Sequence, residues 1–229
     1  MAYIRTKKVK GKKYQYLVEG YRDQNGNVKQ RTIRYLGAAS STEELATITF
    51  AEYLSYQDGT NRRYELVDGQ LVTMPPASFL HSDIIDFIAD CFKAIARQHK
   101  LDLKVKTGDV GVRTGSNSSR IPDISVIDGQ LWQSYRRNQS AIIEDGIILA
   151  VEVVSPGVEQ IARDYTDKVK EYQNAGIPEY WIVDPEEQKV TVLILKDGRY
   201  SKTVFTGKDE IVSITFSQLQ LTASEIIEA

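Results

Sequence analysis

A single acidic residue interrupts an almost wholly apolar run, Ile147 to Val154 (IILAVEVV). Such a run, rich in β-branched and aliphatic residues, is typical of a central strand that is buried on both faces of a sheet. Glu152 would then place a carboxylate in the protein interior. A buried charge is costly unless it is paired or bound to a metal ion, so Glu152 is either a structural ion-pair partner or part of a functional site.

A second carboxylate, that of Asp123, follows Pro122 at the start of another strand-like run that ends at Ile127. On neighbouring strands, the carboxylates of Asp123 and Glu152 could converge on one divalent cation. One cysteine and two histidines exclude a zinc cluster of Cys and His ligands. Oxygen ligands favour Mg²⁺, which Mn²⁺ could replace. Glu65 would join this metal site if it faces the cleft, or would lie on a solvated strand face.

A lysine is expected to face the same sheet from a helix over residues 159–174, which Gly176 would end. Successive residues of a helix are about 100° apart around its axis. Four residues then lie within roughly 60° of one another on one face: Ile161, Tyr165, Lys168 and Tyr172. Lys168 therefore needs an anionic partner, whereas Lys170 points to solvent. That partner is either the pair of acids on the strands or a substrate phosphate. Asp164, four residues before Lys168, is a competing partner for the lysine.

Helical spacing of apolar residues predicts a long helix from Ser78 to about Gln98. His81 lies near its start, where it would contact a phosphate of the substrate or pack as a structural histidine. Thr49 and Glu52 predict a capping box that opens a short helix through about Leu54.

Strands are predicted at several places, with hairpin turns at Asp68-Gly69 and at 196–199. The predicted strands cover residues 103–113, 119–127, 147–154, 179–184, 189–195 and 199–205, and the tail, 211–229, would form a strand and a short helix. This order of elements indicates a mixed β-sheet flanked by helices, an α/β fold.

The first 40 residues form a separate basic segment. Residues 1–37 hold ten Lys and Arg but two acids, a net charge of +8, whereas the rest of the chain carries −10. Asn25-Gly26 between two strand-like runs predicts a β-hairpin arm that binds nucleic acid along its phosphates or in a groove. The alternative is a flexible, solubilising leader. The candidate substrate-binding residues of the arm are Lys7, Lys8, Lys10, Lys12, Lys13, Arg31 and Arg34.

The motif formed by Pro122-Asp123 and Glu152-Val153-Val154 resembles the PD-(D/E)XK nuclease signature. Residues 47–229 are similar to a restriction-endonuclease-like family that is expanded in cyanobacteria. Other stretches that carry the resemblance are 63–69, 74–76, His81, Ser155-Pro156, Asp164, Lys168 and 176–185. The resemblance implies a restriction-endonuclease-like domain over 47–229, a Mg²⁺-dependent endonuclease, with Asp123 and Glu152 as metal ligands and Lys168 as the catalytic lysine. The arm, residues 1–40, resembles a basic β unit of transposase-type proteins, on residues 16–21 and 34–37.

One departure from the signature leaves alternatives open. The lysine of the E-x-K element is replaced by Val154, so catalysis needs Lys168 from the helix. If Lys168 does not reach the metal site, the protein would be a catalytically degenerate, DNA-binding accessory protein on a nuclease fold. A toxin-like or RNA-directed nuclease is a third interpretation.

The composition is that of a soluble globular protein, with 41% apolar and 26% charged residues. The sequence has no apolar run of transmembrane length and no secretory signal, so we expect a cytoplasmic protein without membrane association. DNA is the expected partner, and a homodimer would allow cleavage of both strands.

Overall fold

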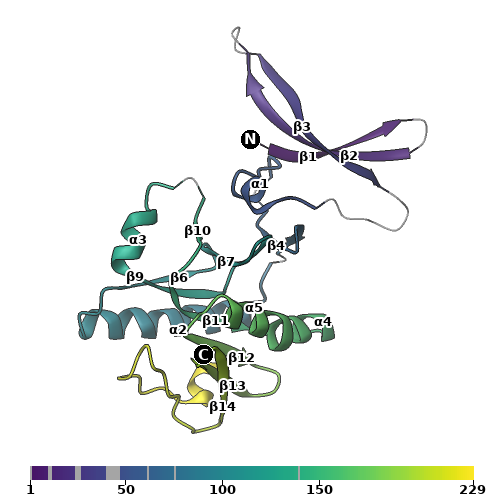
Figure 1. Ribbon diagram of the computed structural model, residues 1–229. Coiled ribbons are helices and arrows are strands. Elements are labelled where there is room, and N and C mark those ends of the chain that lie inside the picture. The colour runs from purple at the N-terminus through teal and green to yellow at the C-terminus, as the bar shows by residue number, and fades with distance from the viewer. Residues whose placement is uncertain are drawn as a thin grey trace. The chain divides into compact units, whose positions relative to one another are not determined.

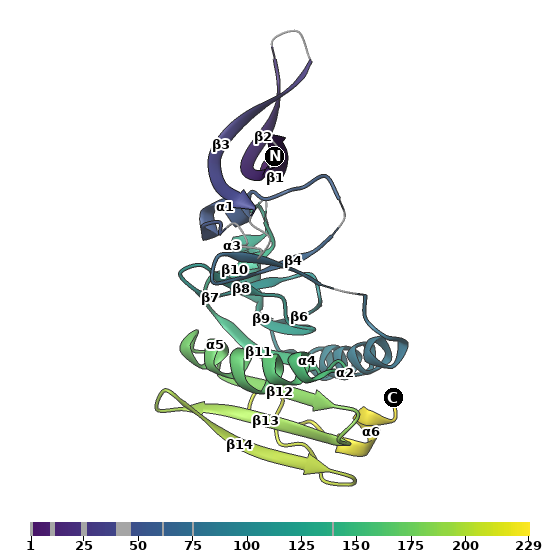
Figure 2. The same cartoon turned by 90° about the vertical axis from the view of Figure 1, so that its right-hand side faces the viewer.

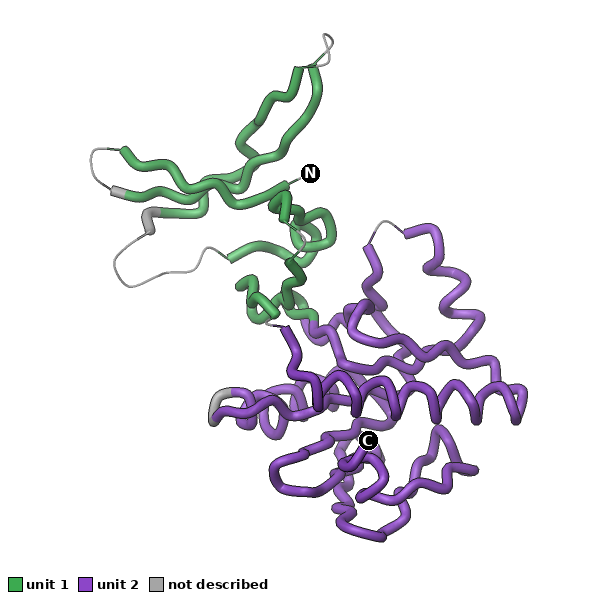
Figure 3. The backbone as a smooth tube through the Cα atoms, turned by 180° about the vertical axis from the view of Figure 1, so that it is seen from behind, with its two compact units in different colours: residues 1–74, 116–119 green, residues 75–115, 120–229 purple. Residues whose placement is uncertain are grey.

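The computed structural model describes residues 2–9, 12–23, 27–39, 47–60, 62–74, 76–138 and 140–229. The chain divides into two compact units (Figure 3). Unit 1 comprises residues 1–74 and 116–119, and unit 2 comprises 75–115 and 120–229. No helix in the described residues has the length and apolar character needed to cross a membrane.

Unit 1 contains a three-stranded antiparallel sheet in the order β1 (Ala2–Val9), β2 (Lys12–Arg22) and β3 (Val28–Ala39) (Figure 1). The predicted pairing of β2 with β3 is confirmed, although its Asn25-Gly26 turn lies outside the described residues. The structure adds β1, which pairs with β2 along its whole length. The expected hairpin is therefore one half of a larger sheet.

The rest of unit 1 also follows local sequence signals. Helix α1 (Phe50–Leu54) begins with the predicted capping box, in which the side chains of Thr49 and Glu52 each accept a backbone N–H of the other residue. Strands β4 (Tyr64–Val67) and β5 (Gln70–Thr73) form the predicted hairpin. Its turn residues, Asp68 and Gly69, both have positive φ angles, as a type I′ turn requires.

Unit 2 is built on a six-stranded mixed sheet in the order β14-β13-β12-β11-β9-β6. These strands are β6 (Leu103–Thr107), β9 (Ile124–Asp128), β11 (Ile147–Val153), β12 (Glu179–Asp184), β13 (Lys189–Lys196) and β14 (Arg199–Thr206). Strands β11 and β12 run parallel, and the other neighbours run antiparallel (Figure 2). The predicted mixed sheet with flanking helices is confirmed, and β11 lies inside it.

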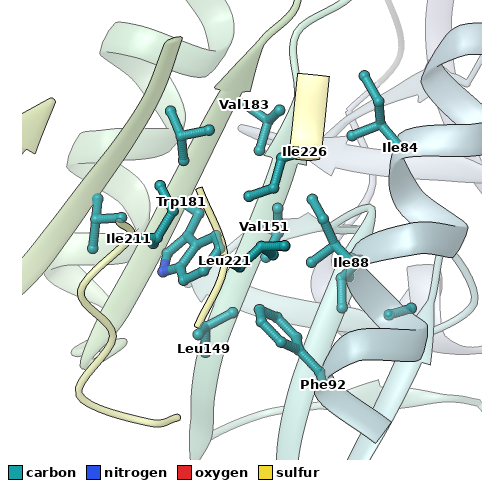
Figure 4. Close-up of a cluster of buried hydrophobic side chains, with 14 of the residues drawn as sticks. Ile84, Ile88, Phe92, Leu149, Val151, Trp181, Val183, Ile211, Leu221 and Ile226 are labelled. Carbon is teal, nitrogen blue, oxygen red and sulfur yellow. The ribbon is translucent and has the colours of Figure 1, made fainter. Parts of the chain in front are cut away.

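Apolar side chains cover both faces of this sheet. Helices α2 (Phe79–Gln98) and α6 (Ala223–Ile227) pack on one face, where Ile88 and Phe92 meet Val151 and Trp181 (Figure 4). On the opposite face, α5 (Lys168–Asn174) contributes Tyr172 to a second cluster. Each fully buried side chain of this size contributes roughly 1.5–3 kcal/mol of transfer free energy. Strand β11 is therefore buried on both faces, as its apolar run predicts.

Three expectations about elements were wrong. Residues 103–113 are divided between β6 and β7 (Gly111–Gly115), and residues 119–127 between β8 (Ser118–Arg120) and β9. In the tail, residues 211–222 form no strand, and only the helix α6 is present. Helix α3 (Gly129–Tyr135) and strand β10 (Ile142–Ile143), which pairs with β7, were not predicted.

The predicted helix over 159–174 is three consecutive helical segments. An α-helical turn, α4 (Val158–Ala162), leads into a π-helical turn, η1 (Arg163–Asp167), and then into α5. Gly176 ends α5 as predicted, with a φ of 73°. Its N–H donates to the carbonyl of Gln173 and that of Ile177 to the carbonyl of Tyr172, the hydrogen bonds of a Schellman motif.

Candidate active site

Two carboxylates lie on neighbouring strands, as the sequence predicts. Glu152 is near the end of β11 and only 3% exposed. Asp123 immediately precedes β9, and its Oδ2 accepts the backbone N–H of Val153 at 2.8 Å. Ile124 pairs with Val151 in the antiparallel register, so Asp123 and Glu152 are adjacent across the two strands. Both acids therefore belong to one end of this strand pair.

Lys168, the first residue of α5, points at this pair of strands. Its Nζ lies 2.7 Å from Oε2 of Glu152 and 3.1 Å from Oδ1 of Asp164, and its side chain is 3% exposed. The prediction that Lys168 faces the sheet is confirmed, and Lys170 is exposed, as expected. The two partners considered from the sequence, Glu152 and Asp164, both bind the same ammonium group.

The π-helical turn corrects the predicted face of this helix. A regular period of 100° per residue places Ile161 on the buried face, but Ile161 is 37% exposed. In a π turn, hydrogen bonds span five residues instead of four, so the turn holds one more residue and shifts the register. Asp164 is only 1% exposed and lies on the inward face together with Lys168. Such turns are frequent at functional sites.

Buried tyrosines complete the surroundings of these charges. Tyr172 donates its hydroxyl to Oε1 of Glu152 at 2.7 Å, and Tyr180 donates to the backbone carbonyl of Asp164 at 3.0 Å. Burial raises the pKa of Tyr180 well above its usual value, and the negative charges of Glu152 and Asp164 raise it further. The Tyr180 hydroxyl therefore stays protonated and acts as a donor. Tyr172 was expected on this helix face, but its bond to Glu152 was not foreseen.

His81 joins the site through Asp123. Its Nε2 lies 3.2 Å from Oδ2 of Asp123, and its Nδ1 lies 3.4 Å from Oγ of Ser155. The Ser78 side chain caps α2 by accepting the N–H of His81, which fixes the start of the helix. The sequence left open whether His81 is functional or packs structurally, and the structure places it against a candidate metal ligand. Ser155 belongs to a stretch that carries the family resemblance, but its contact with His81 was not foreseen.

The remaining candidates lie in unit 1. Glu65, in β4, is 2% exposed, which excludes the solvated strand face as its location. Arg31 is ion-paired with Glu19, and Arg34 with Glu52. Lys7, Lys8 and Lys13 have exposed side chains, whereas Lys10 and the side chain of Lys12 lie outside the described residues.

The donor set suits a hard divalent cation. Mg²⁺ is usually bound by one or two protein carboxylates and retains several waters, so Asp123 and Glu152 are sufficient in number and kind. Nearby, Oδ2 of Asp164 is buried without a hydrogen-bond partner in the structure. Among the described residues, no group of three or more His, Cys, Asp or Glu side chains is arranged to hold a metal ion. A cation held by Asp123 and Glu152 would therefore need water or phosphate to complete its coordination.

Comparisons with known proteins place the chain in a family. The model of the Uma2 family, described as "Putative restriction endonuclease", matches residues 50–224. The model of the IS1634 family transposase N-terminal domain matches residues 4–65, in line with the resemblance of the basic segment. No curated protein matches the chain.

A solved structure shares the fold. It is the crystal structure of a "putative nuclease belonging to DUF820" from Anabaena variabilis, with a TM-score of 0.64 and 20% sequence identity. The similarity covers 79% of this chain and 98% of the other. The fold is therefore restriction-endonuclease-like. Since the Uma2 model spans most of the chain, the protein belongs to the Uma2 family.

Proposed function

We propose that the protein is a metal-dependent endonuclease that hydrolyses phosphodiester bonds in DNA, with Mg²⁺ as its metal. The observation that carries the proposal is the 2.7 Å contact between Lys168 Nζ and Glu152 Oε2. The E-x-K position holds the apolar, buried Val154, so the strand itself offers no lysine there. The contact supports the interpretation that α5 supplies the missing ammonium group beside the acids.

Each residue has a distinct part in this proposal. Asp123 and Glu152 would hold the metal, which when bound polarises a phosphodiester and promotes ionisation of an attacking water. Lys168 orients that water or stabilises the negative charge that develops on the phosphate. Asp164 holds Lys168 in place from the same helix, and His81 positions Asp123 or contacts a phosphate. The role of Glu65 as an additional metal ligand stays a prediction from the sequence.

The basic sheet of unit 1 would add affinity for the nucleic acid. Exposed lysines that contact phosphates release counterions, so the affinity falls as salt rises. Lys7, Lys8 and Lys13 are the strongest candidates, with Lys10 and Lys12 beside them in sequence. Arg31 and Arg34 would contribute less, because each is engaged by a carboxylate within unit 1.

Incubation with supercoiled plasmid in Mg²⁺ or Mn²⁺ tests the activity. We expect the wild-type protein to nick or linearise the plasmid, and we expect Asp123→Asn and Lys168→Ala to abolish cleavage. Lys170→Ala, an exposed lysine on the same helix, is the matched control and should cleave normally. Cleavage of the plasmid by Asp123→Asn at the wild-type rate would refute the assignment.

A catalytically degenerate, DNA-binding accessory protein is the second candidate function. It is favoured by the presence of Val154 in place of the signature lysine and by the neutralisation of Glu152 by Lys168. This candidate predicts DNA binding without cleavage and without a metal site. Calorimetry decides between the two, because Mn²⁺ binding that disappears in Asp123→Asn supports the nuclease.

A further inference from the structure

The sheet of unit 1 carries an open hollow lined mainly by tyrosines. Val9, Tyr14, Tyr16 and Tyr35 surround a volume of about 330 Å³. The ring centroids of Tyr16 and Tyr35 are 5.2 Å apart, and those of Tyr14 and Tyr35 are 6.3 Å apart. Tyr35 is 53% exposed and Val9 48% exposed. The volume lies at the lower end of the roughly 300–1,000 Å³ typical of pockets that bind small molecules.

An irregularity in strand pairing creates this cluster. Gln15 pairs with Gly37, but Tyr16 pairs with Tyr35, so Leu36 is an extra residue in β3. Without that extra residue, Tyr35 would be opposite Leu17 and would face the other side of the sheet, since side chains alternate along a strand. Gly37 has a φ of 121°, which glycine adopts readily. The bulge therefore brings Tyr35 beside Tyr16.

Positive charge surrounds the tyrosines on the same face. Lys7 pairs with Tyr14 across β1 and β2, and Arg5 pairs with Tyr16. Lys7 Nζ lies 5.2 Å from the centroid of the Tyr16 ring, a cation–π contact. The first 37 residues carry a net charge of +8. The occupant that suits this face is therefore anionic and also offers planar aromatic groups.

Nucleic acid has both properties, and the form that exposes its base faces is the unpaired one. In a duplex, the bases stack on one another and present only their edges, whereas a single strand can stack its bases on aromatic side chains along a basic groove. We propose that the tyrosine hollow binds an unpaired base of single-stranded DNA, with Lys7 and Arg5 close to the adjoining phosphates. This inference rests on the proposed function and specifies the form of nucleic acid that the basic sheet recognises.

Fluorescence anisotropy of the full-length protein with a labelled oligothymidylate tests the proposal, in metal-free buffer with chelator so that no cleavage occurs. A hairpin duplex carrying the same label is the comparison. We expect tighter binding to the single strand. Removing one stacking ring, in Tyr35→Ala, should weaken binding to oligothymidylate about fivefold to 150-fold, which corresponds to about 1–3 kcal/mol per stacked base. Binding to the duplex should change much less.

Two control variants separate stacking from general effects on the sheet. Tyr35→Phe keeps the ring and should bind like the wild type. Tyr21→Ala removes a tyrosine of β2 that is 44% exposed and outside the hollow, and it should also bind like the wild type. Equal losses in Tyr35→Ala and Tyr21→Ala, or equal affinity for duplex and single strand, would overturn the proposal.

The binding experiment with oligothymidylate and the plasmid cleavage experiment can fail independently of each other. If plasmid cleavage depends on Asp123 but oligothymidylate binding does not depend on Tyr35, the hollow lacks the proposed role and the nuclease stands. If binding depends on Tyr35 and no metal supports cleavage, the hollow stands and the nuclease fails.

Discussion

Replacing Lys168 should destabilise unit 2 strongly, whether or not this residue takes part in catalysis. Its side chain is 3% exposed and pairs with two acids that are equally buried, Glu152 and Asp164. Removing one partner of a buried ion pair leaves an uncompensated charge, which costs about 3–5 kcal/mol. Lys168→Met isolates this cost, since methionine retains much of the apolar stem. We expect the free energy of unfolding to fall by this amount.

Urea denaturation followed by tryptophan fluorescence measures the loss, because Trp181 is fully buried in the core of unit 2. Lys170→Met is the matched control on the exposed side of the same helix, and it should change the free energy of unfolding by less than about 0.5 kcal/mol. The double variant Lys168→Met with Glu152→Gln removes both members of the shorter pair. It should recover part of the loss, since Asp164 keeps its contact with Arg163.

A small effect would refute this reasoning. If Lys168→Met costs less than about 1 kcal/mol, the pair behaves as a solvent-exposed ion pair, and the geometry described for α5 is wrong. The measured loss of stability also shows whether Lys168 variants are folded in the cleavage experiment. Typical domains have about 5–15 kcal/mol of stability, so a loss of 3–5 kcal/mol leaves most Lys168 variants folded for the activity assay.

Three further predictions concern stability. Phe92→Ala, in a core where this ring stacks on Phe216 at 4.4 Å, should cost about 3–5 kcal/mol in urea denaturation; a cost under 1 kcal/mol would contradict the packing. Thr49→Ala should destabilise unit 1 by about 1 kcal/mol through loss of the α1 cap, whereas Thr49→Ser should retain it. Burial raises the pKa of Tyr53 to about 12, so the folded state retains a proton that the unfolded chain releases near pH 10. Stability should therefore decrease as pH rises from about 10 to about 12, and a thermal midpoint that stays constant over this range would exclude the effect.

Most elements of the fold were predictable, because their signals are local. The apolar run around Glu152 predicts a strand buried on both faces, and the Thr49–Glu52 pair and Gly176 predict helix ends, each through contacts within a few residues. Helix α3 also had such a signal, since Asp128 caps it by accepting two backbone N–H groups, but its short apolar pattern was not recognised.

The candidate site was predictable in its residues but not in its details. Asp123, Glu152 and Lys168 have unusual chemical surroundings in the sequence, a charge among apolar neighbours or on an apolar helix face. The π-helical register depends on how the helix packs on the sheet, and a sequence period does not contain that information. The hydrogen bond from Tyr172 to Glu152 likewise depends on how α5 packs against β11.

The extra residue in the π-helical turn makes the site sensitive to a kind of mutation that leaves every motif residue in place. Deleting one exposed residue of the turn, such as Thr166, would allow a regular α-helix from Val158 to Asn174. Asp164 and Lys168 would then be three residues apart instead of four, still neighbours on the helix surface, but the 3.1 Å contact between them would have a different geometry. Loss of a single codon would thus change the arrangement of the buried charges while the aligned sequence still shows the aspartate, the glutamate and the lysine.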